Sequence, residues 1–211
     1  MKAPVMGAIA PVLWGTTYAV TTELLPGFNP FAVAAVRALP VGLLLTLLGW
    51  QLPQSNWRWR IVVLGVLNIG AFFALLFVAA YRIPGGVVAT LGAAQPLIVL
   101  FGNWLFFGSR PRLLSLLLAG IGISGVALLV LNPGAALDRT GLIAAAGAAV
   151  AMAFGVLLTK RWGRPVGLLT FTGWQLTVGG AFVGGIAIVT SSAPAALTLS
   201  NWIGFAWLGL L

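Results

Sequence analysis

Long runs of apolar residues, separated by short polar connections, dominate the pattern of this chain. A run of about 20 apolar residues is long enough to cross a bilayer core of roughly 30 Å as an α-helix. The sequence contains seven such runs and the first part of an eighth, which begins at Trp202. The seven runs are Pro4–Leu24, Pro30–Trp50, Ile61–Tyr81, Pro84–Phe107, Leu113–Asn132, Thr140–Thr159 and Val166–Thr190. The pattern predicts an all-α membrane protein, a multi-span helical bundle with seven full spans and the start of an eighth.

Composition supports the same class of protein. Of the 211 residues, 61% are hydrophobic and 6% are charged, whereas soluble domains are about 25% charged. The connections, such as residues 26–30 and 132–134, are short and rich in Pro, Gly and Asn, which leaves no room for a soluble domain. We therefore expect a multi-pass protein of the cell (inner) membrane, with the lipid bilayer as its surroundings.

The net charge of +9 carries information about topology. The basic residues stand singly or in pairs between apolar runs, so they form no stripe that suits nucleic acid. With the N-terminus in the cytoplasm, only Arg82 and Arg139 fall outside. Inside fall Lys2, Arg58, Arg60, Arg110, Arg112, Lys160, Arg161 and Arg164, with Trp57, Trp59, Trp104 and Trp162 beside them. Basic loops and an aromatic belt of this kind predict a cytoplasmic N-terminus.

An internal repeat is visible when the chain is shifted by about 138 to 145 residues. The aligned pairs are Arg37 with Gln175, Gly42 with Gly180, and the Ser-Asn-Trp motifs at 55–57 and 200–202. The shift predicts a repeat of five spans, and because five is odd the second copy is inverted in the membrane. We expect residues 1–134 to form the first repeat and residues 135–211 an incomplete second one. On this view the chain ends inside a helix, and about three more spans follow.

Five short motifs carry a family resemblance. They are Trp-Gly-Thr-Thr-Tyr at 14–18, Arg-Ala-Leu-Pro at 37–40, and the segments 67–73, 80–86 and 172–176. These motifs resemble the EamA family of the drug/metabolite transporter superfamily, most of all its PecM branch, which is described as exporting the blue pigment indigoidine. The resemblance implies ten helices in two inverted repeats, cytoplasmic termini and export of small metabolites. Many relatives carry a glutamate where this chain has Ser109, so no role for that acid is carried over.

Two helix faces are candidates for lining a cavity. Trp14, Thr17, Tyr18 and Thr21 recur at helical spacing, so they share one face of the first span. Thr170, Trp174 and Thr177 form a comparable face in the repeat-related seventh span. Either the faces contact a planar or amino-acid-like solute, or they pack against neighbouring helices with their hydroxyls bonded to their own backbone.

Single polar residues deep in the spans leave similar alternatives. Arg37 lies about 10 Å below the outer boundary of the second span, where it either extends outward to solvent or meets an anionic group of a substrate or a helix C-terminus. Asn68 and Gln95 either bond a solute or join helices to one another. The candidate substrate-binding residues are Trp14, Thr17, Tyr18, Arg37, Asn68, Gln95, Trp174 and Gln175.

Enzyme chemistry has no visible basis in the sequence. The chain lacks histidine and cysteine, and its only carboxylates, Glu23 and Asp138, are predicted at the outer ends of spans. No catalytic residue, metal site or cofactor is predicted. We expect a secondary transporter that exports a small metabolite (an amino-acid-like, pigment or drug-like solute) by alternating access. A channel or an uncoupled facilitator is the alternative, and an intramembrane enzyme is a less favoured one.

Ion coupling has one candidate residue. Proton-driven transporters usually cycle a proton on an acid or histidine within the membrane, and Glu23 is the only acid predicted within a helix. Either Glu23 is the coupling site, or coupling is absent or supplied by helices beyond this chain. We favour the second explanation, because a carboxylate at the wet end of a helix ionises readily without a functional reason.

Overall fold

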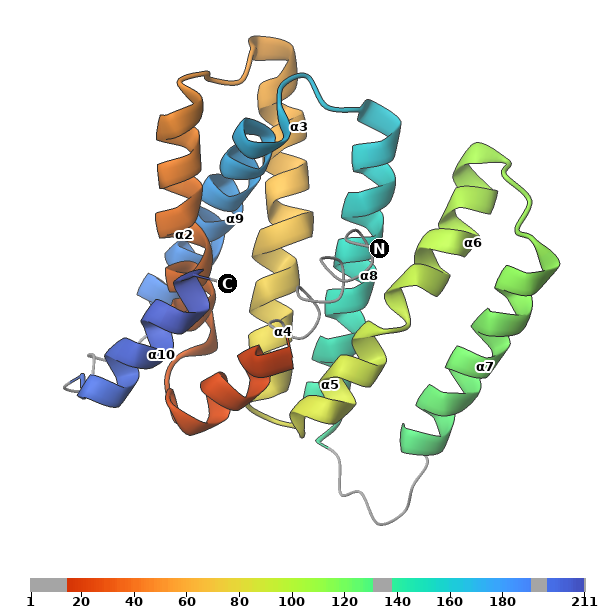
Figure 1. The fold of residues 1–211 in the computed structure, drawn as a ribbon, viewed down its shortest axis with the longest axis horizontal. Helices are drawn as coiled ribbons and strands as arrows, with labels where there is room; N and C mark the ends of the chain where they lie inside the picture. Colours follow the sequence, from red (N-terminus) through yellow and green to blue (C-terminus); the bar gives the residue numbers. More distant parts are fainter. Residues whose placement is uncertain (1–14, 131–137, 191–196, 211) are drawn as a thin grey trace, which may run out of the picture.

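The computed structural model describes residues 15–130, 138–190 and 197–210, and the regular structure in these ranges is entirely helical (Figure 1). This confirms the predicted all-α class. Residues 15–23 form the described part of the first helix. The others are α2 (Pro30–Gly49), α3 (Ser55–Gly65), the π-helix η1 (Val66–Ala71), α4 (Phe72–Ala80), α5 (Gly85–Gly92), α6 (Gln95–Phe107), α7 (Leu113–Val130), α8 (Arg139–Trp162), α9 (Leu168–Thr190) and α10 (Leu199–Leu210).

Five of the described helices or continuous helix pairs are long and apolar enough to cross a membrane. They are Pro30–Gly49, Ser55–Ala80, Gly85–Phe107, Arg139–Trp162 and Leu168–Thr190, with a shorter apolar helix from Leu113. Each overlaps a predicted run, and the largest difference is at the start of Ser55–Ala80, which begins six residues before the predicted Ile61. Most of the predicted first span, Pro4–Leu24, lies outside the described residues. Large apolar side chains cover the outer surfaces of these helices, as expected where lipid replaces water.

Two predicted spans are less regular than their hydropathy suggests. The run Pro84–Phe107 is not one straight helix, because α5 ends at Gly92 and α6 begins at Gln95. Pro96 lacks an N–H and its ring opposes the carbonyl four residues earlier, so the helix breaks there. The run Ile61–Tyr81 contains η1, whose wider turn is a feature often found at functional sites.

Turn chemistry fixes the helix ends. The side chain of Asn29 accepts a hydrogen bond from the backbone N–H of Phe31 at the start of α2. Asp138 does the same for the N–H of Gly141 at the start of α8, over 2.7 Å. Gly108 ends α6 with φ 65°, a left-handed conformation that glycine adopts without a steric cost.

The helices α2 and α9 run in opposite directions and pack closely against each other at one side of the bundle, on the left in Figure 1. Glycines let their backbones touch. A Cβ atom added at Gly42 would lie 2.5 Å from the backbone nitrogen of Thr177, and one added at Gly180 would lie 2.8 Å from that of Leu39. The pair therefore tolerates no side chain at these two points.

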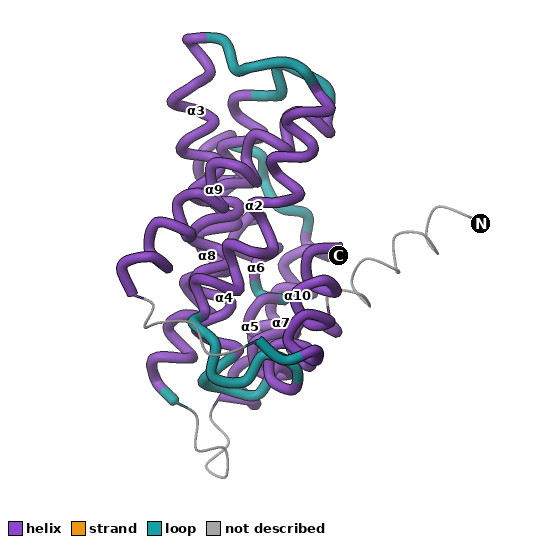
Figure 2. Tube along the Cα trace, turned by 90° about the vertical axis from the view of Figure 1, so that its left-hand side faces the viewer, coloured by secondary structure: helices purple, strands orange, loops and turns teal. Residues whose placement is uncertain are grey.

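The bundle is elongated (Figure 2), and its two ends differ in charge. The connections α2–α3, α6–α7 and α8–α9 lie at one end, uppermost in Figure 1. We call it the basic end, because the described residues there include Arg58, Arg60, Arg110, Arg112, Lys160, Arg161 and Arg164. The opposite end holds Glu23, Arg139 and the half-exposed pair Arg82–Asp138, whose nearest N···O distance is 3.7 Å.

Candidate functional site

A cavity of about 230 Å³ lies among the first helix, α4, α5 and α8. We call it the central cavity. Among the described residues of its lining, only Tyr18 and Gln95 have polar side chains. The other lining residues are Gly15, Phe72, Leu76, Val88, Ala89, Gly92, Ala93, Ala145, Ala148 and Ala149. An apolar wall with a few polar groups is typical of small-molecule sites.

Small side chains and the helix break create this space. Ala145, Ala148 and Ala149 recur at helical spacing and present one short-chained face of α8. A Cβ atom added at Gly92 would meet no heavy atom within 4 Å, so the end of α5 is open to the cavity. By contrast, a Cβ atom at Gly85 would lie 2.6 Å from the Cβ of Tyr18, so glycine there lets the Tyr18 side chain pack against α5.

Arg37 turns into the bundle. Its side chain is 6% exposed, and its Nη1 donates a hydrogen bond of 2.8 Å to the hydroxyl of Thr17. Its guanidinium carbon lies 5.2 Å from the centre of the Phe73 ring, which is within cation–π range. The outward extension considered from the sequence is therefore not the observed conformation. Within the described residues, Arg37 has no carboxylate partner.

Asn68 and Gln175 form a second buried polar group, the amide cluster, with Thr159. The Nδ2 of Asn68 donates to Oε1 of Gln175 over 2.7 Å and to the hydroxyl of Thr159 over 3.3 Å. The Oδ1 of Asn68 is buried, packs against Gly155 and has no hydrogen-bond partner in the part of the chain that the structure describes. These bonds join η1 to α8 and α9, so Asn68 serves here as a link between helices.

The remaining candidates are dispersed. The indole N–H of Trp174 donates to the carbonyl of Gln51 over 2.8 Å, at a separate cavity of about 330 Å³ near the basic end. That end cavity is lined by Gln51, Leu52, Gln54, Trp57, Pro165, Val166 and Trp174. Glu23 is exposed at the end of the first helix, and Trp14 lies outside the described residues.

The structure thus brings the candidates together in pairs. Tyr18 and Gln95 share the central cavity, Thr17 bonds Arg37, and Asn68 bonds Gln175. The sequence did not predict that apolar residues line a cavity, because small residues such as Ala89 and Gly92 equally indicate close packing between helices. The small-residue face of α8 is the signal that identifies the lining residues.

The described residues offer a limited set of chemical groups. No group of three or more His, Cys, Asp or Glu side chains in the described ranges is placed to hold a metal ion. The central cavity offers one phenol, one amide and an apolar wall. Such groups recognise a small solute through shape and hydrogen bonds.

Comparisons with known proteins identify related transporters. The sequence model of the EamA-like transporter family matches residues 1–131. Protein PecM of Dickeya dadantii (strain 3937) is 47% identical over 213 residues, which cover 100% of this chain and 71% of PecM. An uncharacterized transporter of Synechocystis, sll0355, is 33% identical and shares 88% of this chain and 63% of its own length.

The chain also resembles an inner membrane transporter and a protein of known structure at lower sequence identity. The uncharacterized inner membrane transporter YedA of Escherichia coli (strain K12) is 28% identical over 98% of this chain and 70% of its own length. A solved crystal structure aligns with a TM-score of 0.73 at 22% identity, covering 100% of this chain and 75% of that one. At this identity the structural likeness concerns the fold alone.

Proposed function

Because the chain belongs to the EamA-like transporter family, we propose that it is a secondary transporter of the inner membrane that exports a small metabolite by alternating access. The observation that carries the proposal is the central cavity, a partly open space beside helices long and apolar enough to span the membrane. Transporter sites commonly lie near the middle of the bilayer, between helices of the bundle.

The lining of the central cavity suggests the class of solute. Its volume of about 230 Å³ is below the usual range for drug-sized ligands, so it suits a small molecule. The phenol of Tyr18 and the amide of Gln95 offer hydrogen bonds on an otherwise apolar wall. We infer a small amino-acid-like or pigment-like solute with a planar or apolar body and one or two polar groups.

We infer further that residues 1–134 and 135–211 are inverted repeats. The crossing of α2 and α9 supports this, because its close contacts are reciprocal. Gly42 approaches Thr177, and Gly180 approaches Leu39. A shift of 138 residues converts each contact into the other, which is what a two-fold axis between related helices produces.

Hydrogen bonds in the first helix and α8 support the same repeat. The hydroxyl of Thr21 donates to the carbonyl of Thr17, and that of Thr159 donates to the carbonyl of Gly155. These two bonds are again related by 138 residues. We assign the basic end to the cytoplasm, in keeping with the excess of basic residues there.

Export by a carrier is tested by the metabolites that leave the cell. Cells that produce the protein are compared with cells that lack it by untargeted profiling of the medium, and transport of the enriched solute is then measured in inverted membrane vesicles. We expect uptake that saturates with solute concentration. Flux that rises linearly would favour a channel, and no enriched solute would contradict export.

A further inference from the structure

Three indole rings surround the guanidinium of Arg60 at the basic end. Its central carbon lies 5.2 Å from the ring centre of Trp57, 5.5 Å from that of Trp59 and 5.8 Å from that of Trp162. The Trp59 and Trp162 rings meet edge to face at 4.9 Å. We call these four residues from α3 and α8 the tryptophan cage. It holds a positive charge in a fixed place.

One N–H group of Arg60 inside the cage lacks an acceptor. The Nε is buried and has no hydrogen-bond partner among the described residues. Aromatic faces attract the cation, but they do not accept its in-plane N–H groups as an oxygen does. A guanidinium fork matches the oxygens of a phosphate or carboxylate in a bidentate manner. Among the described residues, the guanidinium of Arg60 therefore has no anionic partner.

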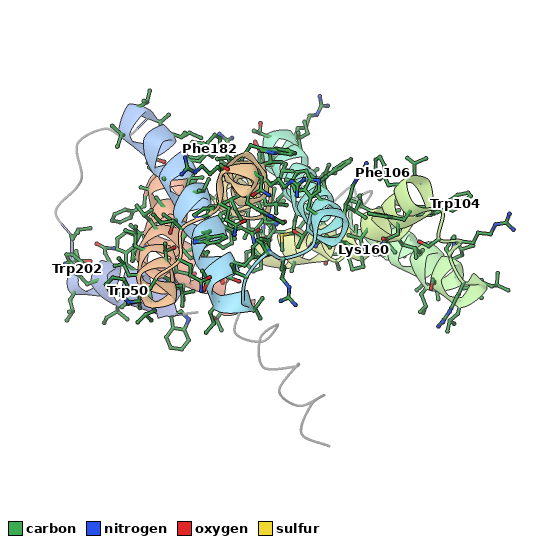
Figure 3. All side chains as sticks on the ribbon, turned by 90° about the horizontal axis from the view of Figure 1, so that it is seen from above. Trp50, Trp104, Phe106, Lys160, Phe182 and Trp202 are labelled. Atoms are coloured by element: carbon green, nitrogen blue, oxygen red, sulfur yellow. The ribbon has the colours of Figure 1, made fainter. Side chains whose placement is uncertain are left out.

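The chain itself has no anion for this place. Its only carboxylates are Glu23 and Asp138, and both lie at the opposite end of the bundle. Lys160, labelled in Figure 3, lies at the same end as Arg60. It differs because its ammonium already donates to Oδ1 of Asn103 over 2.7 Å. The missing partner of Arg60 must come from outside the described protein.

The surroundings of the cage indicate an amphiphilic anion. Arg60 lies five residues after Ser55, roughly 8 Å along α3, at the level where tryptophans mark the lipid headgroups. Trp59 and Val62 lie three residues apart on α3 and are 53% and 50% exposed. This apolar surface next to the charge suits an acyl chain beside a headgroup. A free inorganic anion would gain nothing by contact with these apolar side chains.

We propose that the tryptophan cage binds the phosphate of one anionic phospholipid, such as phosphatidylglycerol, through the guanidinium of Arg60. The rings of Trp57, Trp59 and Trp162 hold the guanidinium in place, and its N–H groups donate to the phosphate oxygens. The lipid tail lies along the exposed face of α3. This site is distinct from the central cavity and does not depend on which solute is exported.

Native mass spectrometry of the purified protein tests the proposal by titration with phosphatidylglycerol or with phosphatidylcholine of the same acyl chains. We expect one phosphatidylglycerol to bind at concentrations where phosphatidylcholine does not. Arg60→Gln is expected to weaken that binding about tenfold, since it removes a charge-assisted bidentate contact. Arg60→Lys keeps the charge without the planar fork, so its affinity for phosphatidylglycerol is expected to lie between those of the parent protein and Arg60→Gln. This variant also controls for a folding defect in Arg60→Gln.

Arg112→Gln is the matched control, because Arg112 is exposed at the same end and lacks an aromatic cage. It is expected to bind phosphatidylglycerol as the parent protein does. Equal losses in the Arg60 and Arg112 variants would show diffuse attraction and overturn the proposal. Equal binding of the two lipids, or displacement of phosphatidylglycerol by inorganic phosphate at similar concentration, would overturn it as well.

Discussion

At the scale of single residues, Arg37 and Gln175 hold equivalent places in the two inferred repeats but have different partners. Arg37 bonds the Thr17 hydroxyl, whereas Gln175 bonds Asn68. The sequence identified these buried polar residues, because polar side chains are rare in the spans. It did not distinguish a solute contact from a link between helices, since that depends on how η1 is rotated against α8 and α9.

The amide cluster is expected to stabilise the bundle. We predict a coupling free energy of roughly 0.5–1.5 kcal/mol between Asn68 and Gln175, the range for hydrogen bonds between membrane helices. The measurement is a double-mutant cycle of Asn68→Ala and Gln175→Ala, followed by unfolding in mixed micelles. Strictly additive effects of the two substitutions would show that the bond contributes nothing.

Glu23 is expected to have no part in coupling. Its side chain is exposed at the end of the first helix, where the carboxylate is solvated whether or not transport occurs. We predict that Glu23→Gln leaves both the export rate and its response to a proton gradient unchanged. Export measured with and without an uncoupler checks this. A variant that still exports but no longer responds to the gradient would assign coupling to Glu23.

At the scale of elements, the α2–α9 crossing depends on glycine. A methyl group at Gly42 or Gly180 would collide with the facing backbone, which cannot move as a flexible side chain does. We predict that Gly42→Ala and Gly180→Ala each destabilise the protein by about 1–3 kcal/mol, the usual cost of overpacking. Thermal unfolding in detergent measures the effect.

Gly185→Ala in α9 is the control for this pair. A Cβ atom at Gly185 would meet no heavy atom within 4 Å, so the substitution is expected to be neutral or slightly stabilising through higher helix propensity. If Gly42→Ala unfolds at the same temperature as Gly185→Ala, the two helices do not cross as closely as described.

The elements show what hydropathy can and cannot predict. It located the helices, because a span must be apolar over about 20 residues. It did not locate the break between Gly92 and Gln95 or the π-turn at η1, because both depend on hydrogen bonds within the span. Pro96 stands at the start of α6, where the helix is interrupted. Pro40, however, lies inside the uninterrupted helix α2, so proline alone does not determine where a helix breaks.

At the scale of the whole molecule, the charge difference between the two ends predicts orientation. The parent chain has no cysteine, so single cysteines report their own position. We predict that Ser55→Cys and Pro165→Cys react with a membrane-impermeant thiol reagent only after the cells are opened. Pro26→Cys, next to Gly27 with its φ of 73°, is expected to react in intact cells. The reverse pattern would place the basic end outside.

The site was less predictable than the fold. Tyr18 and Gln95 were recognisable as polar residues within spans. The central cavity itself exists largely because Gly92 and the alanines of α8 carry no large side chains. A missing side chain creates a cavity only where no neighbour fills the space. That information depends on the packing of four segments distant in sequence, so the pattern of one span does not contain it.

Blocking the central cavity tests the account most directly. Gly92→Leu adds a side chain where the cavity is open, while Gly86→Leu adds the same side chain to the same helix at a position with no neighbour within 4 Å and outside the cavity lining. The measurement is the rate of solute export at matched amounts of folded protein in the membrane. We expect Gly92→Leu to fall to the rate of cells that lack the protein and Gly86→Leu to keep the parental rate. Parental export by Gly92→Leu would contradict a pathway through the central cavity.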